Sequence, residues 1–225
     1  KMTMTKEDVL KSVKDHKIKC IHLWFVDILG LLKYFVISAS ELDGAFSEGM
    51  GFDGSSIQGF CRIEASDLVA IPDSSTFTII PSHSNEYYGR MFCDIFNPDG
   101  TPFAGDSRYI LKRSIAKATK LGYTCYVGPE LEFFYFKNGQ GTEGLDNGAY
   151  FDLPPLDMGS DLREDTILNL ERMGIPVEYS HHEVAPSQHE IDLRYQEALT
   201  MADAAVTYRQ TVKEIAMKHG VYATF

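Results

Sequence analysis

The chain has 225 residues, of which 44% are hydrophobic and 24% charged, a composition typical of one or two globular domains. Its formal net charge of −11 argues against nucleic acid or an anionic membrane surface as a partner. No apolar run approaches the roughly 18 residues of a membrane-spanning helix. Four scattered cysteines, without a Cys-x-x-Cys pair or a signal peptide, indicate free thiols in a cytoplasmic protein.

The first part of the chain has the pattern of a small α+β sheet domain that ends in the turn Asn-Pro-Asp-Gly at 97–100. Thr5 and Asp8 predict a capping box that begins a short helix, and a second short helix is expected over residues 38–46. A glycine-rich loop is expected at residues 49–59. Five segments rich in apolar residues are expected to be strands: 18–26, 32–37, 67–71, 76–80 and 90–95.

The second part, residues 106–225, also mixes helices and strands. Helices are expected at 106–121, capped by Asp106, at 161–173 and at 197–219. Strands are expected at 123–136, with an interruption at Gly128-Pro129, and at 177–184, 190–195 and 221–225. The four glycines of residues 137–148 indicate a loop or hairpin tip. The fold class predicted for the whole chain is therefore α+β.

Two glutamates lie in the apolar strand segment Gly-Pro-Glu-Leu-Glu-Phe-Phe, residues 128–134. On a strand, Glu130 and Glu132 face the same side with Cα atoms roughly 6.6 Å apart. One interpretation is a solvent-facing edge strand. The other is a pair of ligands for a hard cation such as Mg²⁺ or Mn²⁺, because bare carboxylates are costly among apolar side chains.

Two further glutamates lie in His-His-Glu-Val-Ala-Pro-Ser-Gln-His-Glu, residues 181–190. A four-residue turn at 185–188 would place Glu183 directly opposite Glu190. Like charges in that position destabilise a hairpin unless a cation lies between them, and Glu132 could complete such a site. The alternative is another register that separates the two glutamates. The histidines beside them are by themselves more typical of a structural role.

Absent motifs restrict the chemistry. The sequence has no P-loop, no His-Glu-x-x-His and no Gly-x-Ser-x-Gly, which argues against a P-loop nucleotide site, a zinc protease and a serine hydrolase. The segment Gly-Phe-Asp-Gly-Ser-Ser-Ile at 51–57 is a polar loop among apolar strands, which a plain turn would also explain.

Four motifs, in this order and at similar spacing over nearly the whole chain, resemble glutamine synthetase: Phe-Asp-Gly-Ser-Ser-Ile (52–57), Asn-Pro-Asp-Gly-Thr-Pro-Phe (97–103), and the two glutamate segments at 128–134 and 181–190. The resemblance implies a β-grasp domain over residues 1–105, followed by the first part of the catalytic α+β domain. It also implies two Mg²⁺ or Mn²⁺ sites. Glu132, Glu183 and Glu190 match ligands of one metal, and Glu130 matches a ligand of the second, beside the ATP phosphates.

The resemblance implies roles for five other residues. Asp53 matches the aspartate that binds ammonium and accepts its proton, with Ser56 and Tyr150 lining that site. Glu178 and Tyr195 match positions at the nucleotide. In the simple hairpin register Glu178 faces away from Glu183, so its role requires a bulge in the strand.

The implied reaction joins ammonia to L-glutamate through a γ-glutamyl phosphate made with ATP. Members of the family assemble as dodecamers with active sites between subunits, so Asp53 would act on a neighbouring copy. They also continue for roughly as many residues again. We therefore expect this chain to be an N-terminal fragment, inactive alone, that lacks most of the sheet joined by residues 221–225.

Two alternative functions remain open from the sequence. One is a related ligase that couples glutamate to another amine, which the ammonium-site residues Asp53, Ser56 and Tyr150 argue against. The other is a short, non-catalytic homologue that binds metal or other subunits.

Overall fold

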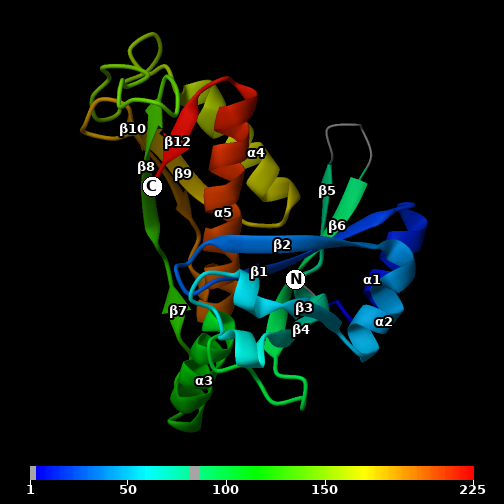
Figure 1. Ribbon diagram of the computed structural model, residues 1–225. Helices are drawn as coiled ribbons and strands as arrows, with labels where there is room; N and C mark the ends of the chain where they lie inside the picture. The colour runs from blue at the N-terminus through cyan, green and yellow to red at the C-terminus, as the bar shows by residue number, and fades with distance from the viewer. Residues whose placement is uncertain (1–3, 82–86) are drawn as a thin grey trace. The chain divides into compact units, whose positions relative to one another are not determined.

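The computed structural model of the protein describes residues 4–81 and 87–225. They form two compact units, Lys1–Gly122 (unit 1) and Tyr123–Phe225 (unit 2), each with its own sheet (Figure 1). Among these described residues no helix combines the length and the apolar character needed to cross a bilayer. The four cysteines are free, as their spacing predicts.

Unit 1 is built on a mixed sheet. Its strands are β1 (Cys20–Val26), β2 (Leu32–Ser38), β3 (Met50–Asp53), β4 (Asp67–Pro72), β5 (Thr78–Pro81) and β6 (Tyr87–Phe96). Their order is β2-β1-β6-β4-β3, and β5 also pairs with β6. Strand β1 runs parallel to β6, whereas the other pairings are antiparallel.

Two short helices close the core of unit 1. Helix α1 (Lys6–Asp15) begins at the predicted capping box, in which the side chains of Thr5 and Asp8 each accept a hydrogen bond from the other's backbone. Helix α2 (Leu42–Ser47) follows one 3-10 turn, η1 (Ala39–Glu41). The apolar sides of both helices are buried against strand residues, which removes their side chains from water.

The predicted loop at 49–59 is wrong in its first half, because β3 occupies it and pairs with β4. Glycines flank and interrupt this strand, so its sequence lacks a strand pattern. Gly49 has φ +78°, and a Cβ there would lie 2.4 Å from the Val69 side chain. Glycine at this position therefore permits β3 to approach β4 closely.

Helix α3 (Ser107–Lys120) begins at its predicted cap, Asp106. Its Arg108 forms ion pairs with Asp73 and Asp94, at 2.8 and 2.7 Å. These contacts join α3 to the first sheet, and the compact units consequently divide after this helix. The domain boundary placed ahead of Asp106 stays a prediction.

Unit 2 is a four-stranded antiparallel sheet with two helices on one side. Its main elements are β8 (Glu130–Phe136), α4 (Ser160–Arg172), β9 (Val177–His182), β10 (Gln188–Leu193), α5 (Ala198–Lys218) and β12 (Tyr222–Thr224). The strand order is β12-β8-β10-β9. Helices α4 and α5 lie on the same side of this sheet (Figure 1), where the fully buried Tyr208 donates a hydrogen bond to the carbonyl of Leu131.

Two features of unit 2 bear on the sequence prediction. The expected interruption at Gly128-Pro129 is confirmed, since it separates β8 from a two-residue strand, β7 (Tyr126–Val127), which pairs with β11 (Gln196–Glu197). Strand β12 pairs with β8 along three residues, so residues 222–224 join the four-stranded sheet of unit 2. The expectation that most of that sheet lies outside this chain stays a prediction.

Candidate metal centre and substrate site

One face of the unit 2 sheet is strongly acidic. Successive residues of a strand face opposite sides, and neighbouring strands align these side chains into rows. Two adjacent rows across β8, β10 and β9 are Glu132–Glu190–His181 and Glu130–Asp192–Tyr179. The opposite face is the one covered by α4 and α5. The sheet thus presents four carboxylates in two neighbouring rows on a single surface.

The structure brings Glu183 and Glu190 together, although in a different register from the predicted one. Glu190 pairs with His181, and the backbone N–H of Glu183 donates to the carbonyl of Gln188. This is a slip of two residues, which leaves every side chain on its predicted face. The slip arises because Ser187, with φ +62°, completes the turn, so that Gln188 already belongs to β10.

His181 lies between these two glutamates. Its Nδ1 is 3.4 Å from Glu183 Oε1 and its Nε2 is 3.5 Å from Glu190 Oε2. One potential ligand atom from each of the three residues lies within 4.8 Å of the other two. Carboxylate and imidazole together suit Mn²⁺ and related divalent cations. The sequence interpretation of His181 as merely structural therefore overlooked a member of this cluster.

Glu132 is placed differently from the other two predicted ligands. It is the direct cross-strand partner of Glu190, but its exposed carboxylate accepts a hydrogen bond from the side chain of Gln188. The cluster of His181, Glu183 and Glu190 does not include it. A shared role for the three glutamates as metal ligands stays a prediction.

The electrostatics of the cluster favour a cation. Burial raises the pKa of Glu190 to about 8, and the neighbouring carboxylates of Asp192 and Glu183 contribute to the increase. In the metal-free chain, Glu190 is therefore largely protonated at neutral pH. A cation at this point would favour the ionised form instead.

We expect Glu190→Gln to stabilise the metal-free chain at high pH. Because the folded-state pKa of Glu190 lies above its ordinary 4.5, the wild-type chain should lose stability as pH rises from about 4.5 to about 8. The variant should not show that loss. Urea unfolding in EDTA across this range measures the difference, which should grow with pH. Glu164→Gln, at an exposed position of α4, is the control, and a pH-independent difference for Glu190→Gln would contradict the prediction.

A buried network holds the hairpin from its other face. Asp146 Oδ1 lies 2.9 Å from His182 Nε2 and accepts a hydrogen bond from the Ser187 backbone at 3.0 Å. Arg163 donates to His189 Nδ1 at 2.7 Å, and burial with this guanidinium lowers the pKa of His189 to about 3. His182 and His189 each precede a glutamate of the acidic face. These contacts, on the face of the hairpin opposite the glutamates, therefore fix the backbone that carries Glu183 and Glu190.

Asp146, His182 and His189 also have ligand-type atoms within 4.8 Å of one another. The Asp146 carboxylate, however, already accepts hydrogen bonds from the backbone N–H groups of Gly148, Met158 and Ser187. Hydrogen bonding accounts for this carboxylate without a metal.

Asp53 and Ser56 lie together in unit 1, where β3 ends. Asp53 caps the 3-10 turn η2 (Gly54–Ser56), accepting hydrogen bonds from the backbone and hydroxyl of Ser55 at 2.9 and 2.6 Å and from the hydroxyl of Ser56 at 3.1 Å. These bonds, from Ser55 first, lower the pKa of Asp53. The carboxylate is thus ionised and exposed, but ordinary turn chemistry produces the same contacts, so its role with ammonium stays a prediction.

Tyr150 and Tyr195 lie in unit 2. Tyr150 stacks on Phe151 with ring centroids 4.0 Å apart, and it meets His181 edge-on at 5.3 Å. It therefore lies beside the Glu183–Glu190 cluster. Tyr195 is exposed and meets Tyr126 edge-on at 5.9 Å. This aromatic pair offers a flat apolar surface of the kind on which a base can stack.

Glu178 occupies a bulge in β9. Asp192 pairs with Tyr179 and Leu193 pairs with Val177, which leaves Glu178 as the extra residue between them. The sequence interpretation required such a bulge for Glu178 to act at the nucleotide. Its exposed carboxylate lies 3.9 Å from Arg194, and its role stays a prediction.

Asp192 is the acidic residue that sequence reasoning missed. It is 6% exposed, and its carboxylate shares a hydrogen bond with the side chain of Glu190. It follows Glu190 by two positions on the same strand. The period of two that relates Glu130 to Glu132 could have identified it.

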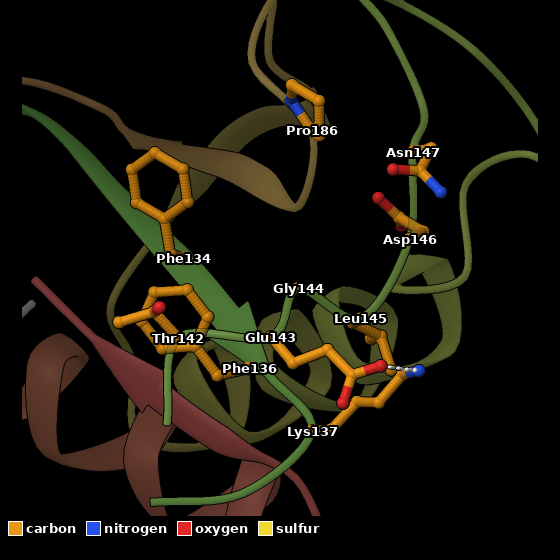
Figure 2. Close-up of a pocket in the computed structure, with 10 residues that line it drawn as sticks. All are labelled: Phe134, Phe136, Lys137, Thr142, Glu143, Gly144, Leu145, Asp146, Asn147 and Pro186. Atoms are coloured by element: carbon orange, nitrogen blue, oxygen red, sulfur yellow. Dashed lines mark hydrogen bonds and ion pairs between the residues drawn. The ribbon is translucent and has the colours of Figure 1, made fainter. Parts of the chain in front are cut away.

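A hollow of about 520 Å³ opens beside the end of β8 (Figure 2). Its lining contains an ion pair between Lys137 and Glu143. The lining residues are Phe134, Phe136, Lys137, Thr142, Glu143, Gly144, Leu145, Asp146, Asn147 and Pro186. It contains none of the nine predicted site residues, so the candidate chemistry lies on the open acidic face of the sheet and not in this hollow.

Comparison with known proteins identifies related chains. The family model of the glutamine synthetase β-grasp domain matches residues 17–98, and that of the glutamine synthetase catalytic domain matches residues 104–225. Curated proteins named glutamine synthetase from Mycolicibacterium smegmatis and Methanosarcina mazei are 53% and 50% identical over the whole of this chain. The chain spans about half the length of these relatives, 52% in both cases.

Solved structures give the same result for the fold. A Plasmodium falciparum glutamine synthetase superposes with a TM-score of 0.89 at 24% identity, covering 99% of this chain and 50% of the other. A complex of the protein GmaS with ADP superposes with a TM-score of 0.87 at 26% identity, covering 97% of this chain and 51% of the other.

Proposed function

The chain belongs to the glutamine synthetase family, and we propose on that basis that it supplies the β-grasp domain and the first part of the catalytic domain of an ATP-dependent glutamate–ammonia ligase. The single observation that carries this proposal is the acidic face of the unit 2 sheet. Family membership predicts metal ligands at Glu132, Glu183 and Glu190, and two of these already meet at His181.

The donor set on this face fits divalent cations. It combines carboxylates from strands β8 and β10 and from Glu183, which follows β9, with the imidazole of His181. Burial, together with the carboxylates of Asp192 and Glu183, raises the pKa of Glu190. Hard cations such as Mg²⁺ and Mn²⁺ take oxygen ligands and retain several waters. We propose that Glu132, Glu183 and Glu190 hold one such cation and that Glu130 contributes to a second.

In the proposed reaction ATP phosphorylates the γ-carboxylate of L-glutamate, and ammonia then displaces phosphate to give glutamine. Bound cations would neutralise charge on the phosphoryl group during its transfer. Asp53, kept ionised by Ser55 and Ser56, would bind ammonium and accept its proton. Tyr150 would line the same site beside His181.

The nucleotide would lie toward the end of the sheet that carries Glu178 and Tyr195. The bulge at Glu178 and the exposed ring pair of Tyr126 and Tyr195 support this placement. We further propose a cytoplasmic homo-oligomer, a dodecamer as the family resemblance implies, in which Asp53 serves the metal site of a neighbouring copy.

The function can be tested in a chimera in which this chain replaces the matched half of the Mycolicibacterium smegmatis relative. With ATP, glutamate and Mg²⁺, the chimera should form glutamine from ammonium and consume ammonium in preference to methylamine and ethylamine. Phosphate release and product analysis measure both. A preference for an alkylamine would overturn the ammonia assignment in favour of a related glutamate–amine ligase.

A further inference from the structure

We propose that Asp146 is a positioning residue that joins the loop of residues 146–158 to the hairpin of residues 181–190, so that the two segments open and close together. The loop carries Tyr150, and the hairpin carries two of the proposed metal ligands. The inference rests on the proposed function, because that function places both segments at one site. What it adds is the residue through which they are connected.

Asp146 holds the turn of the hairpin. Its Oδ1 accepts a hydrogen bond from the Ser187 backbone at 3.0 Å and lies 2.9 Å from His182 Nε2. The other ring nitrogen of His182, Nδ1, lies 2.6 Å from the carbonyl oxygen of Glu183. The Ser187 hydroxyl donates to the Asp146 carbonyl at 2.8 Å. Asp146, His182 and Ser187 are all buried, so water does not readily replace these bonds.

The same carboxylate closes both ends of the loop. Its Oδ1 accepts a hydrogen bond from the backbone of Gly148 at 3.3 Å, and its Oδ2 accepts one from the backbone of Met158 at 2.9 Å. Between these ends, the backbone N–H of Phe151 donates to the carbonyl of His182 at 3.1 Å. Tyr150 directly precedes Phe151. The hydrogen bonds that shape the loop therefore also hold Tyr150 at the hairpin.

Gly148 is the point of closest approach between the loop and the hairpin. It is buried, and a Cβ at this position would lie 2.7 Å from His182 Nε2, the atom that faces Asp146. A methyl group here must push the loop away or displace the His182 ring. A Cβ at Gly141, in contrast, would have no other atom within 4 Å. The two glycines therefore provide a matched pair of substitutions.

The shared carboxylate couples the two segments energetically. Without it, the buried N–H groups of Ser187 in the hairpin and of Gly148 and Met158 in the loop would lose an acceptor, and unpaired buried donors are costly. If either segment moves away, the other loses part of what holds it. A cation that fixes the hairpin should therefore also restrain the loop, which supplies none of the proposed metal ligands.

Hydrogen exchange followed by mass spectrometry tests the connection without metal. The samples are the 225-residue chain in EDTA as wild type, Asp146→Ala, Gly148→Ala and the control Gly141→Ala. We expect both segments to exchange at least about tenfold faster in Asp146→Ala and in Gly148→Ala, because each change opens the joint from one side. Gly141→Ala should exchange as wild type does. Gly148→Ala keeps every hydrogen-bonding group, so it remains informative if Asp146→Ala does not fold.

Manganese tests the positioning role. Added Mn²⁺ should slow exchange in both segments of wild type. The EPR signal of free Mn²⁺ should show an affinity about ten- to a hundredfold lower in Asp146→Ala and Gly148→Ala, the loss typical when groups that hold metal ligands in place are removed. The affinity of Gly141→Ala should equal that of wild type.

The outcomes separate this inference from the proposed function. Faster exchange confined to the loop in Gly148→Ala would show that the segments are independent, and the inference would be wrong. Wild-type Mn²⁺ affinity in a folded Asp146→Ala or Gly148→Ala would also refute it, while the proposed metal site would stand. If wild type binds no Mn²⁺, the proposed metal site fails, and the exchange measured in EDTA still decides whether Asp146 joins the two segments.

Discussion

The 225-residue chain assayed alone is expected to make glutamine at no more than about a thousandth of the rate of the chimera with the Mycolicibacterium smegmatis relative, because arginines that stabilise a transferring phosphoryl group are worth on the order of 10³-fold or more. The family resemblance places those arginines in the portion of the relatives that this chain does not match. The acidic face alone would repel the phosphates of ATP. Glutamine formed from ATP, glutamate and ammonium in the presence of Mg²⁺ or Mn²⁺ is the measurement.

Two controls make this result interpretable. Far-UV circular dichroism must show that the chain alone is folded, and Mn²⁺ binding must show that its acidic face is intact. Turnover by the chain within tenfold of the chimera would mean that the unmatched half is not needed for catalysis. The roles assigned to Glu130, Glu132, Glu183 and Glu190 would then be wrong.

Two inactive variants of the chimera are expected to restore each other's activity when their subunits are mixed. Asp53→Asn removes the proposed proton acceptor in unit 1, and Glu190→Gln removes a proposed metal ligand in unit 2. Each should lower the rate by at least about a hundredfold. If Asp53 serves a neighbouring copy, a random mixture in equal amounts has both wild-type residues at one half times one half, or about a quarter, of its sites.

The experiment requires subunits that exchange, for example by dissociation in mild denaturant and reassembly. Recovery to about a quarter of the unmutated rate supports active sites shared between copies. If Asp53 and Glu190 of the same chain formed one site, no mixture would contain an intact site. The mixture would then remain as inactive as either variant. Mixing each variant with itself under the same treatment is the control.

Much of the local structure could be predicted from the residues alone. The capping box of Thr5 and Asp8 and the cap at Asp106 depend on hydrogen bonds within one helical turn, so a short stretch of sequence is sufficient. The common face of Glu130 and Glu132 follows from the period of two along a strand. The same period kept Glu183 and Glu190 on one face although their register was wrong.

How these elements meet depends on contacts between residues that are far apart in the sequence. The hairpin register depends on Ser187 in a left-handed conformation, and Ser187 is held by Asp146, which lies 41 residues earlier in the chain. The identity of strand β3 depends on Gly49 packing against Val69 of β4.

The acidic character of the site has the same origin. Glu190 and Asp192 are ordinary strand residues in the sequence. In the folded chain both carboxylates are buried, and each lies beside a glutamate of another strand, Glu132 or Glu130. The alternation of residues along a strand and the capping of a helix involve only neighbouring residues, so both can be predicted from a short stretch of sequence. Register, burial and the pairing of distant charges are properties of the packed chain, which only the three-dimensional arrangement determines.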